Sequence, residues 1–220
     1  LRNWIHHNGV SGLNHGIYWA GQGPAWVIGN TFYGNSGWAF HNHQGAYDGW
    51  QGWKHNVHHN LFIGPGGAIV TTGSRGRYTN NTIIRASNAA FWFYNDGHRN
   101  NSIANNIIVE SSNGIHTRDG NVFSHNLTHN SKDTFVGDDP VKGDPQFIAP
   151  EENNFRLKPK SPAKNAGRLV DSSNEERPTL GAYDGNEKWA PPKPLPKYIP
   201  KALKKEREEL KQLELRPVIP

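Results

Sequence analysis

The stretch VHHNLFIGPGGAIVTTG, from Val57 to Gly73, holds two histidines, an asparagine, a short apolar run, a glycine cluster and a second apolar run. Four other stretches align with it without a gap: IHHNGVSGLNHGIYWAG (5–21), VIGNTFYGNSGWAFHNH (27–43), YTNNTIIRASNAAFWFY (78–94) and IANNIIVESSNGIHTRD (103–119). Self-similarity at such a period is the signature of a repeat architecture, in which each copy is one structural unit.

Apolar residues keep fixed offsets within these copies. The reference asparagines are Asn8, Asn30, Asn60, Asn81, Asn106 and Asn126. The position three before them carries Ile5, Val27, Val57, Tyr78, Ile103 and Phe123. The position two after carries Val10, Phe32, Phe62, Ile83 and Ile108, and Thr128 breaks this row. The position nine after carries Ile17, Ala39, Ile69, Ala90 and Ile115. An amphipathic helix would need apolar spacings of three and four. The short alternating runs, rich in β-branched and aromatic residues and divided by turn residues, predict β-strands instead.

A unit of this kind predicts one coil of a solenoid, because neighbouring coils bury the apolar face that a single coil cannot bury alone. Equivalent residues then stack about 4.8 Å apart, which is the spacing of paired strands. Aligned asparagines at a turn can hydrogen-bond along such a stack. We therefore expect about six coils between residues 1 and 130, with Asn60, Asn81 and Asn106 stacked inside one turn.

Motifs such as IHHNGVSGLNHGIYW and IANNIIVESSNGI resemble the right-handed parallel β-helix repeat family. That family includes polysaccharide lyases, pectin-degrading hydrolases, alginate epimerases and phage tailspikes. The resemblance covers residues 1–130 and implies an all-β, right-handed, single-stranded parallel β-helix. DPQF (144–147), NFRLKPKSPAKNAG (154–167) and PTLGAY (178–183) resemble the usual end of bacterial proteins in this group.

Composition divides the chain into coils (1–130), a closing coil and C-terminal cap (131–188), and a proline-rich strap with a charged helical tail (189–220). Within the last part, WAPPKPLPKYIP favours an extended polyproline-like strap. KALKKEREELKQLEL then predicts a short C-terminal helix. A longer loop, residues 44–56, carries Tyr47, Trp50 and Trp53, and long loops on a rigid solenoid often carry function.

The overall composition limits the possible partners. The 220 residues include no cysteine, and the net charge is +5. No run approaches the roughly 18 apolar residues of a membrane span. The chain begins within a repeat, so we expect a mature or truncated product that is secreted or displayed at the cell surface. A net positive charge favours binding to acidic polymers. We expect the partner to be an acidic polysaccharide rather than nucleic acid. We also expect the chain to self-associate through the open N-terminal end or the tail.

Alternation along a strand predicts which side chains face outward. If the position nine after each asparagine points inward, the positions ten and twelve after it point outward. These rows are Tyr18, Phe40, Val70, Phe91 and His116, then Ala20, Asn42, Thr72, Phe93 and Arg118, with His43 one step beyond. Sugar C–H faces pack on aromatic rings and sugar carboxylates pair with arginine. The rows therefore predict a glycan groove, with Phe40, Asn42, His43, Phe91 and Phe93 binding substrate.

The densest group of reactive side chains lies on the fourth and fifth coils. FYNDGHRN and GIHTRDG contribute Tyr94, Asp96, His98, His116, Arg118 and Asp119, while Arg75 and Arg77, also predicted to bind substrate, leave the preceding coil. Alginate epimerases carry a Tyr, Asp and His in a strand-end motif and a further Asp on the next coil, an order that Tyr94, Asp96, His98 and Asp119 resemble. The Tyr-to-Asp gap is longer in that family, and Gly97 replaces its proline.

Such a site could run β-elimination or C5 epimerisation on a uronic acid. Both reactions remove the proton next to a carboxylate, which requires a cation, a base and an acid. The predicted roles are Arg118 or Arg77 as the cation, His98 or His116 as the base, and Tyr94 as the acid. A Ca²⁺ held by Asp96 and Asp119 could replace the arginine; no other cofactor is indicated. The alternative is that all of these are ordinary surface and turn residues.

The many histidines raise the question of a metal site, but their spacing does not favour one. Tandem pairs such as His6–His7 and His58–His59 point to opposite faces of a strand, and His41 faces inward in the register above. No zinc-binding signature of defined spacing is present. Two functions remain open: a lyase or epimerase acting on acidic polysaccharide, and a non-catalytic fibre, adhesin or glycan-binding module.

Overall fold

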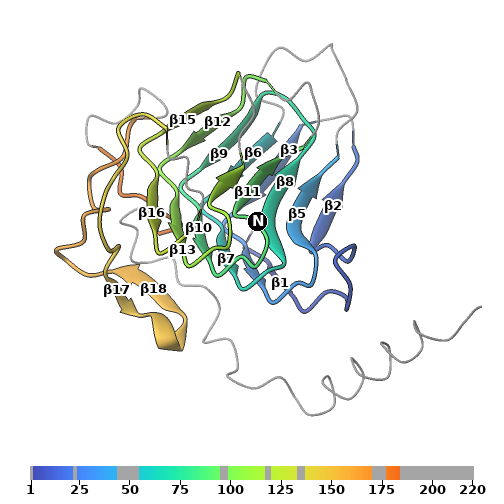
Figure 1. The fold of residues 1–220 in the computed structure, drawn as a ribbon, viewed down its shortest axis with the longest axis horizontal. Helices are drawn as coiled ribbons and strands as arrows, with labels where there is room; N and C mark the ends of the chain where they lie inside the picture. Colours follow the sequence, from blue (N-terminus) through green and yellow to red (C-terminus); the bar gives the residue numbers. More distant parts are fainter. Residues whose placement is uncertain are drawn as a thin grey trace, which may run out of the picture.

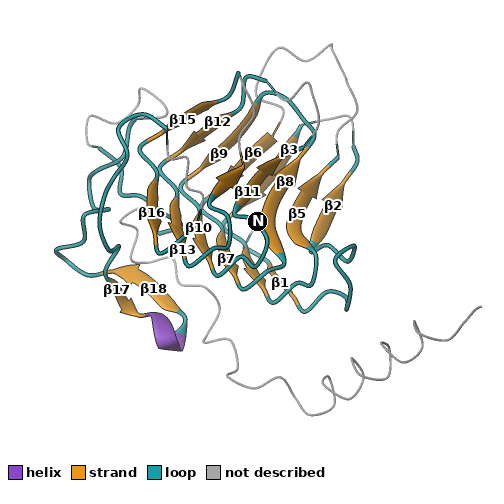
Figure 2. Ribbon diagram, in the orientation of Figure 1, coloured by secondary structure: helices purple, strands orange, loops and turns teal. Residues whose placement is uncertain are grey.

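The computed structural model describes residues 2–21, 24–43, 55–94, 99–116, 120–132, 137–169 and 177–183. These residues form an all-β protein with one short 3₁₀ turn (Figure 2). The predicted strap and tail, the loop with Tyr47, Trp50 and Trp53, and the segment with Asp96 and His98 lie outside the described residues. No helix in the described part of the chain is long and apolar enough to cross a membrane.

Three parallel sheets make up the repeat region (Figure 1). Sheet A contains β1 (Trp4–His6), β4 (Thr31–Tyr33), β7 (Leu61–Ile63), β10 (Thr82–Ile84), β13 (Ile107–Val109) and β16 (Leu127–His129). Sheet B contains β2 (Ile17–Trp19), β5 (Trp38–Asn42), β8 (Gly67–Thr71), β11 (Phe91–Phe93) and β14 (Ile115–His116). Sheet C contains β3 (Ala25–Ile28), β6 (His55–His58), β9 (Gly76–Thr79), β12 (Ser102–Ala104) and β15 (Val122–Ser124).

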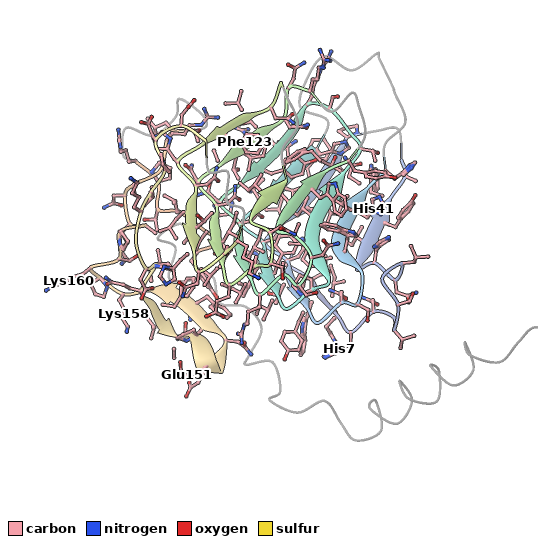
Figure 3. The ribbon with its side chains drawn as sticks, viewed as in Figure 1. His7, His41, Phe123, Glu151, Lys158 and Lys160 are labelled. Carbon is pink, nitrogen blue, oxygen red and sulfur yellow. The ribbon has the colours of Figure 1, made fainter. Side chains whose placement is uncertain are left out.

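Each coil visits sheets A, B and C in turn, and each strand pairs with the strand three further along the chain. This arrangement confirms the predicted parallel β-helix-like stack of coils. Side chains from all three sheets fill the interior, Phe123 among them (Figure 3). The ring centroids of Phe32 and Phe62 stack there 4.8 Å apart. The core is thin but continuous, because each apolar residue meets its equivalents above and below.

The asparagine ladder is present, as predicted. The Oδ1 atom of Asn81 accepts hydrogen bonds from the backbone N–H (3.1 Å) and the Nδ2 (3.0 Å) of Asn60, and Asn106 repeats the pattern beneath Asn81 (2.9 and 3.0 Å). The Nδ2 of Asn81 also donates to the Val57 carbonyl (2.9 Å). Each rung therefore satisfies backbone groups that are buried at the turn between sheets C and A.

The first coil departs from the predicted alignment. Asn3, rather than Asn8, forms the top rung, since its Nδ2 donates to Asn30 Oδ1 at 3.1 Å. Asn8 instead pairs with Asn35 (2.9 Å), on the turn that leads to sheet B. The placement of Asn8 in the ladder was therefore wrong by five residues. Both asparagines stand beside a short apolar strand, so local pattern alone did not distinguish them.

Left-handed backbone conformations flank every strand of sheet A. The residue before each ladder asparagine and the fourth residue after it both have positive φ; they are Arg2, His7, Gly29, Gly34, His59, Gly64, Asn80, Arg85, Asn105, Glu110, His125 and Asn130. These paired bends hold the spacing across sheet A constant from coil to coil. Glycine, asparagine and histidine are over-represented at these bends because few residues tolerate positive φ.

The register of sheet B differs from the ungapped alignment. Phe40 and Phe91, not Ala39 and Ala90, are the partners of Ile69, since the second and fourth coils contain one extra residue in the preceding turn. A shift of one residue exchanges the two faces of a strand. His41 therefore lies on the outside, and its predicted inward orientation was wrong.

The C-terminal segment packs against the outside of the coils. Outward-facing residues of β7, β10, β13 and β16 in sheet A form a second apolar cluster with Phe147, Phe155, Leu180 and Tyr183. Before this segment, residues 138 and 141 continue the stack through isolated parallel bridges. The antiparallel hairpin of β17 (Phe147–Ala149) and β18 (Asn154–Leu157), joined by the 3₁₀ turn Pro150–Glu152, lies beside the last coils, near β13 and β16 (Figure 1).

We predict that Asn81→Ala lowers the free energy of unfolding by about 1–3 kcal/mol, because buried donors and acceptors on both adjacent coils lose their partner. Urea denaturation measures the change. Asn113→Ala is the matched control, since that amide makes a surface bond to the Asn88 carbonyl. Equal stability of the two variants would show that the ladder contributes nothing beyond an exposed amide.

Candidate functional site

The outer face of sheet B carries most of the exposed rings described here. Register places Tyr18, His41, Val70 and Trp92 in one outward row. We call the rings on and beside this row the sheet B face; they are His15, Tyr18, Trp38, His41, His43, Trp92 and Tyr94. The face runs across the coils, so it offers a continuous surface to an extended ligand.

Tyr18 lies at the centre of the upper half of this face. Its ring stacks on His15 (centroids 5.7 Å apart, planes at 17°) and on His43 (6.0 Å, 24°). His41 meets Tyr18 edge to face at 4.8 Å. Tyr18 is 52% exposed. Neighbouring side chains hold the ring in place while part of it stays open to a ligand.

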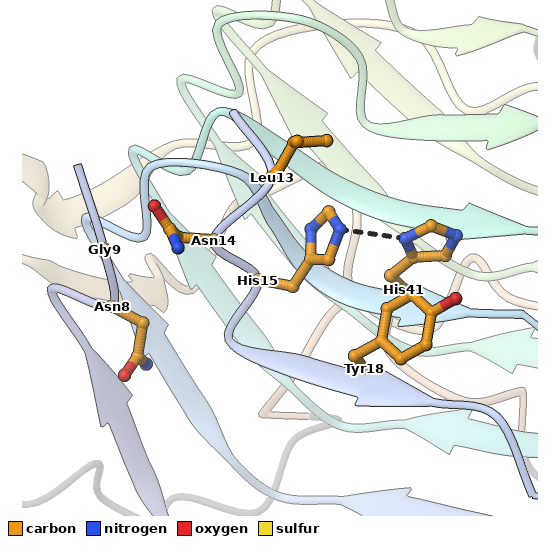
Figure 4. Close-up of a pocket in the computed structure, with 7 residues that line it drawn as sticks. All are labelled: Asn8, Gly9, Leu13, Asn14, His15, Tyr18 and His41. Atoms are coloured by element: carbon orange, nitrogen blue, oxygen red, sulfur yellow. Dashed lines mark hydrogen bonds between the residues drawn. The ribbon is translucent and has the colours of Figure 1, made fainter. Parts of the chain in front are cut away.

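Hydrogen bonds determine the proton positions on two of these histidines. The Trp38 backbone N–H donates to His15 Nδ1 at 3.1 Å, so in the neutral ring the His15 proton resides on Nε2. His15 Nε2 then donates to His41 Nδ1 at 3.0 Å (Figure 4). His41 must consequently carry its own proton on Nε2, a buried atom without a hydrogen-bond partner.

Burial keeps this histidine pair uncharged. Burial first, and then the proximity of His15 and His43, lowers the pKa of His41 to about 4. Burial also lowers the pKa of His15. At neutral pH the pair therefore acts as a neutral hydrogen-bonded relay rather than as a cation. The assigned His15 tautomer also leaves no lone pair on Nε2 for a metal ion.

An open hollow of about 710 Å³ borders the pair. Its lining residues are Asn8, Gly9, Leu13, Asn14, His15, Tyr18 and His41 (Figure 4). Leu13 is 84% exposed at its edge. Asn14 is already engaged, because its Oδ1 accepts from Val10 N and Ser11 N. The hollow thus combines an apolar edge, an aromatic ring and amide groups.

Tryptophans form the lower half of the sheet B face. The rings of Trp38 and Trp92 meet at 5.7 Å, and Trp92 meets Tyr94 at 6.2 Å, both edge to face. Trp38 lies flat over Gly67, where a Cβ would come within 2.4 Å of the indole. Gly67 is therefore required for Trp38 to reach across the next coil to Trp92.

The predicted outward orientation of four residues is wrong. Phe40, Phe91, Phe93 and Asn42 are fully or almost fully buried. The three phenylalanines belong to the interior core, and the Asn42 amide donates to Thr71 Oγ1 inside the coils (2.9 Å). The one-residue shift in sheet B is the cause, because it turns the predicted row inward and the next residue outward.

The structure places the other predicted site residues in different parts of the molecule, and some of them are not described. Tyr94 and His43 lie on the sheet B face, Tyr94 with 48% of its surface exposed. The backbone of His116 pairs with that of Trp92. His98, Asp96, Arg118 and Asp119 lie outside the described residues. Arg77 lies on the outer face of sheet C, and Arg75 occupies the bend before that strand.

The side chains of each tandem histidine pair point towards each other, so the prediction that they point to opposite faces was wrong. The Nδ1 atoms of His6 and His7 lie 3.0 Å apart, and those of His58 and His59 lie 2.7 Å apart. The second histidine of each pair has positive φ, which swings its ring back towards the first. Across the described ranges, no group of three or more His, Cys, Asp or Glu side chains is placed to hold a metal ion.

Sequence reasoning missed His15, Trp38, His41 and Trp92. The available signal was FWF (91–93), since alternation puts Trp92 on the opposite face of the strand from Phe91 and Phe93. It was obscured because three consecutive aromatic residues fit either register. No protein-family model matches the chain, and neither curated proteins nor solved structures give a significant match.

We predict that acidification destabilises the protein partly through His41. Its folded-state pKa of about 4 lies below the ordinary 6.5, so between those values the unfolded chain binds a proton that the folded chain excludes. Stability should therefore fall as the pH drops from 6.5 towards 4. His41→Gln, which cannot titrate, should show a shallower fall in Tm over that range. Parallel Tm profiles for the two proteins would contradict this assignment.

Proposed function

We propose that the chain is a right-handed parallel β-helix protein that binds an acidic polysaccharide along the sheet B face. The observation that supports this most strongly is the set of partly exposed rings from Tyr18 to Tyr94, which the first, second and fourth coils place on one outer face. Sugar rings present C–H faces to aromatic rings, and an extended face suits a polymer better than a small ligand. The net charge of +5 favours an anionic chain.

The histidines suit the hydroxyl groups of sugars. A neutral imidazole provides one donor and one acceptor, which matches a hydroxyl group. His43 is exposed beside the Tyr18 ring, where both groups can contact the same sugar. The inward bonds of His15 hold its ring in place, so little side-chain entropy is lost on binding.

We predict that Trp92→Ala raises the Kd for the bound polysaccharide about tenfold or more, because an aromatic side chain contributes roughly 1.5–3 kcal/mol when buried. Affinity electrophoresis in alginate, pectate and glycosaminoglycans, with a neutral glucan as reference, measures the change. Trp26→Ala is the control, since Trp26 is 57% exposed but lies on sheet C. Equal losses in the two variants would place binding elsewhere.

A second proposal is that the bound uronate reacts by β-elimination or C5 epimerisation. One described feature favours it: Tyr94 is 48% exposed at the end of the face and lies four residues before His98 in the sequence. In this proposal Tyr94 protonates the leaving oxygen or the new carbanion, His98 or His116 removes the proton, and Arg118 neutralises the carboxylate.

We predict that Tyr94→Phe lowers turnover about a hundredfold and leaves Kd nearly unchanged, because only the acidic hydroxyl is removed. The ultraviolet absorbance of unsaturated uronates reports elimination, and proton NMR of the polymer reports epimerisation. Tyr18→Phe is the matched control on the same face and should keep full turnover. If the wild-type protein forms neither product, the catalytic proposal fails while the binding proposal stands.

A further inference from the structure

A group of basic and polar side chains lies on sheet C, on a different face from the proposed glycan site. Its centre is Arg168, which crosses the coils as part of the C-terminal segment. The side chain of Asn105 clamps its backbone, accepting from Arg168 N and donating to Arg168 O, both at 2.9 Å. The guanidinium Nη2 donates to Ser102 Oγ at 2.8 Å. The arginine is thus held in a defined place against the sheet.

Several buried polar atoms near this arginine have no hydrogen-bond partner within the described part of the chain. They are Arg168 Nε, Ser124 Oγ and His125 Nδ1. Register places Ser124 directly beyond Ala104, and Ser102 begins the same strand as Ala104. Natural proteins rarely leave buried polar atoms unpaired, so a cluster of three in one neighbourhood indicates a missing partner. The unpaired guanidinium nitrogen is a donor, so that partner must accept hydrogen bonds.

Charged groups of both signs also meet at this place, where one aspartate and two arginines lie near His125. Burial lowers the pKa of His125, and both Arg177 and Arg168 lower it further, which places the two guanidinium groups within electrostatic range of one imidazole. Asp139 acts in the opposite direction on the same ring. Among the described residues, neither arginine forms an ion pair with a carboxylate. Two arginines near one imidazole, with no carboxylate partner in the described part of the chain, favour an anion between them.

We propose that Arg168, Arg177, Ser124 and His125 form a binding site for an oxyanion, namely a sulfate, phosphate or carboxylate group. The guanidinium groups donate to its oxygens, the serine hydroxyl donates another hydrogen bond, and His125 donates from Nδ1. This site is independent of the sheet B face and of any catalytic activity. It would tie the C-terminal segment to the coils, because Arg168 and Arg177 belong to the segment and Ser124 and His125 to the last coil.

Thermal unfolding in sodium sulfate, sodium phosphate and sodium glucuronate tests the proposal, each compared with sodium chloride at equal ionic strength. A ligand that binds the folded state raises Tm in a saturable way. We expect this for at least one of the three anions, and the ranking identifies the preferred chemistry. Arg177→Gln should raise the Kd for the preferred anion about tenfold. Lys160→Gln removes the same charge from an exposed position in the same segment and should bind like the wild type (Figure 3).

Two outcomes would overturn the proposal. Sulfate raises Tm non-specifically by exclusion from the protein surface, so an increase that does not saturate and is the same in Arg177→Gln is not binding. Arg168→Gln separates a purely structural arginine from a ligand-binding one. If Arg168 only holds the C-terminal segment against the coils, this variant lowers Tm equally in every salt. In that case the NMR signals of the His125 ring in the wild type also do not shift when sulfate is added.

Discussion

The tight turn between sheets C and A imposes the main physical constraint on this protein. The chain bends there within two residues, and the turn buries backbone groups that no strand can pair. The asparagine at each turn accepts two hydrogen bonds from the coil above and donates to a backbone carbonyl of that coil, as Asn60 does to Val27 (2.7 Å). Because every rung needs the next, the asparagines must stack in line, and the strands on either side follow.

The other two turns of each coil carry no equally strict constraint. The turn before sheet B differs by one residue among the second to fifth coils and is longer in the first coil. The connection from sheet B to sheet C also varies, from the short link after Thr71 to the long segment after His43. Variation is tolerated where backbone groups reach water or form simple coil-to-coil bonds. The ladder thus supplies a rigid scaffold, and the freer turns supply the places where side chains can be exchanged without loss of the fold.

The three outer faces have different roles as a result. The lower part of sheet A is covered by the C-terminal segment, whose aromatic residues shield an apolar surface from water. Sheet B is open and carries rings that neighbouring coils align, with a neutral histidine pair at its upper end. Sheet C presents arginines, among them Arg77 and the clamped Arg168. One repeated backbone therefore offers an aromatic surface and a basic surface on adjacent sides.

The sequence by itself determined the parallel coils, the ladder from Asn30 to Asn126 and the core rows beside it, because these positions keep constant offsets across a turn that hydrogen bonds hold at one length. It did not determine the top rung or the outward row of sheet B, since Asn3 and Asn8 look alike locally and FWF fits either register. Only the tertiary structure decided that His41 and Trp92 face outward while Phe40 and Phe91 are buried. The physical reason is that one extra residue in an unconstrained turn exchanges the two faces of a strand, and only pairing with the neighbouring coils reveals the exchange.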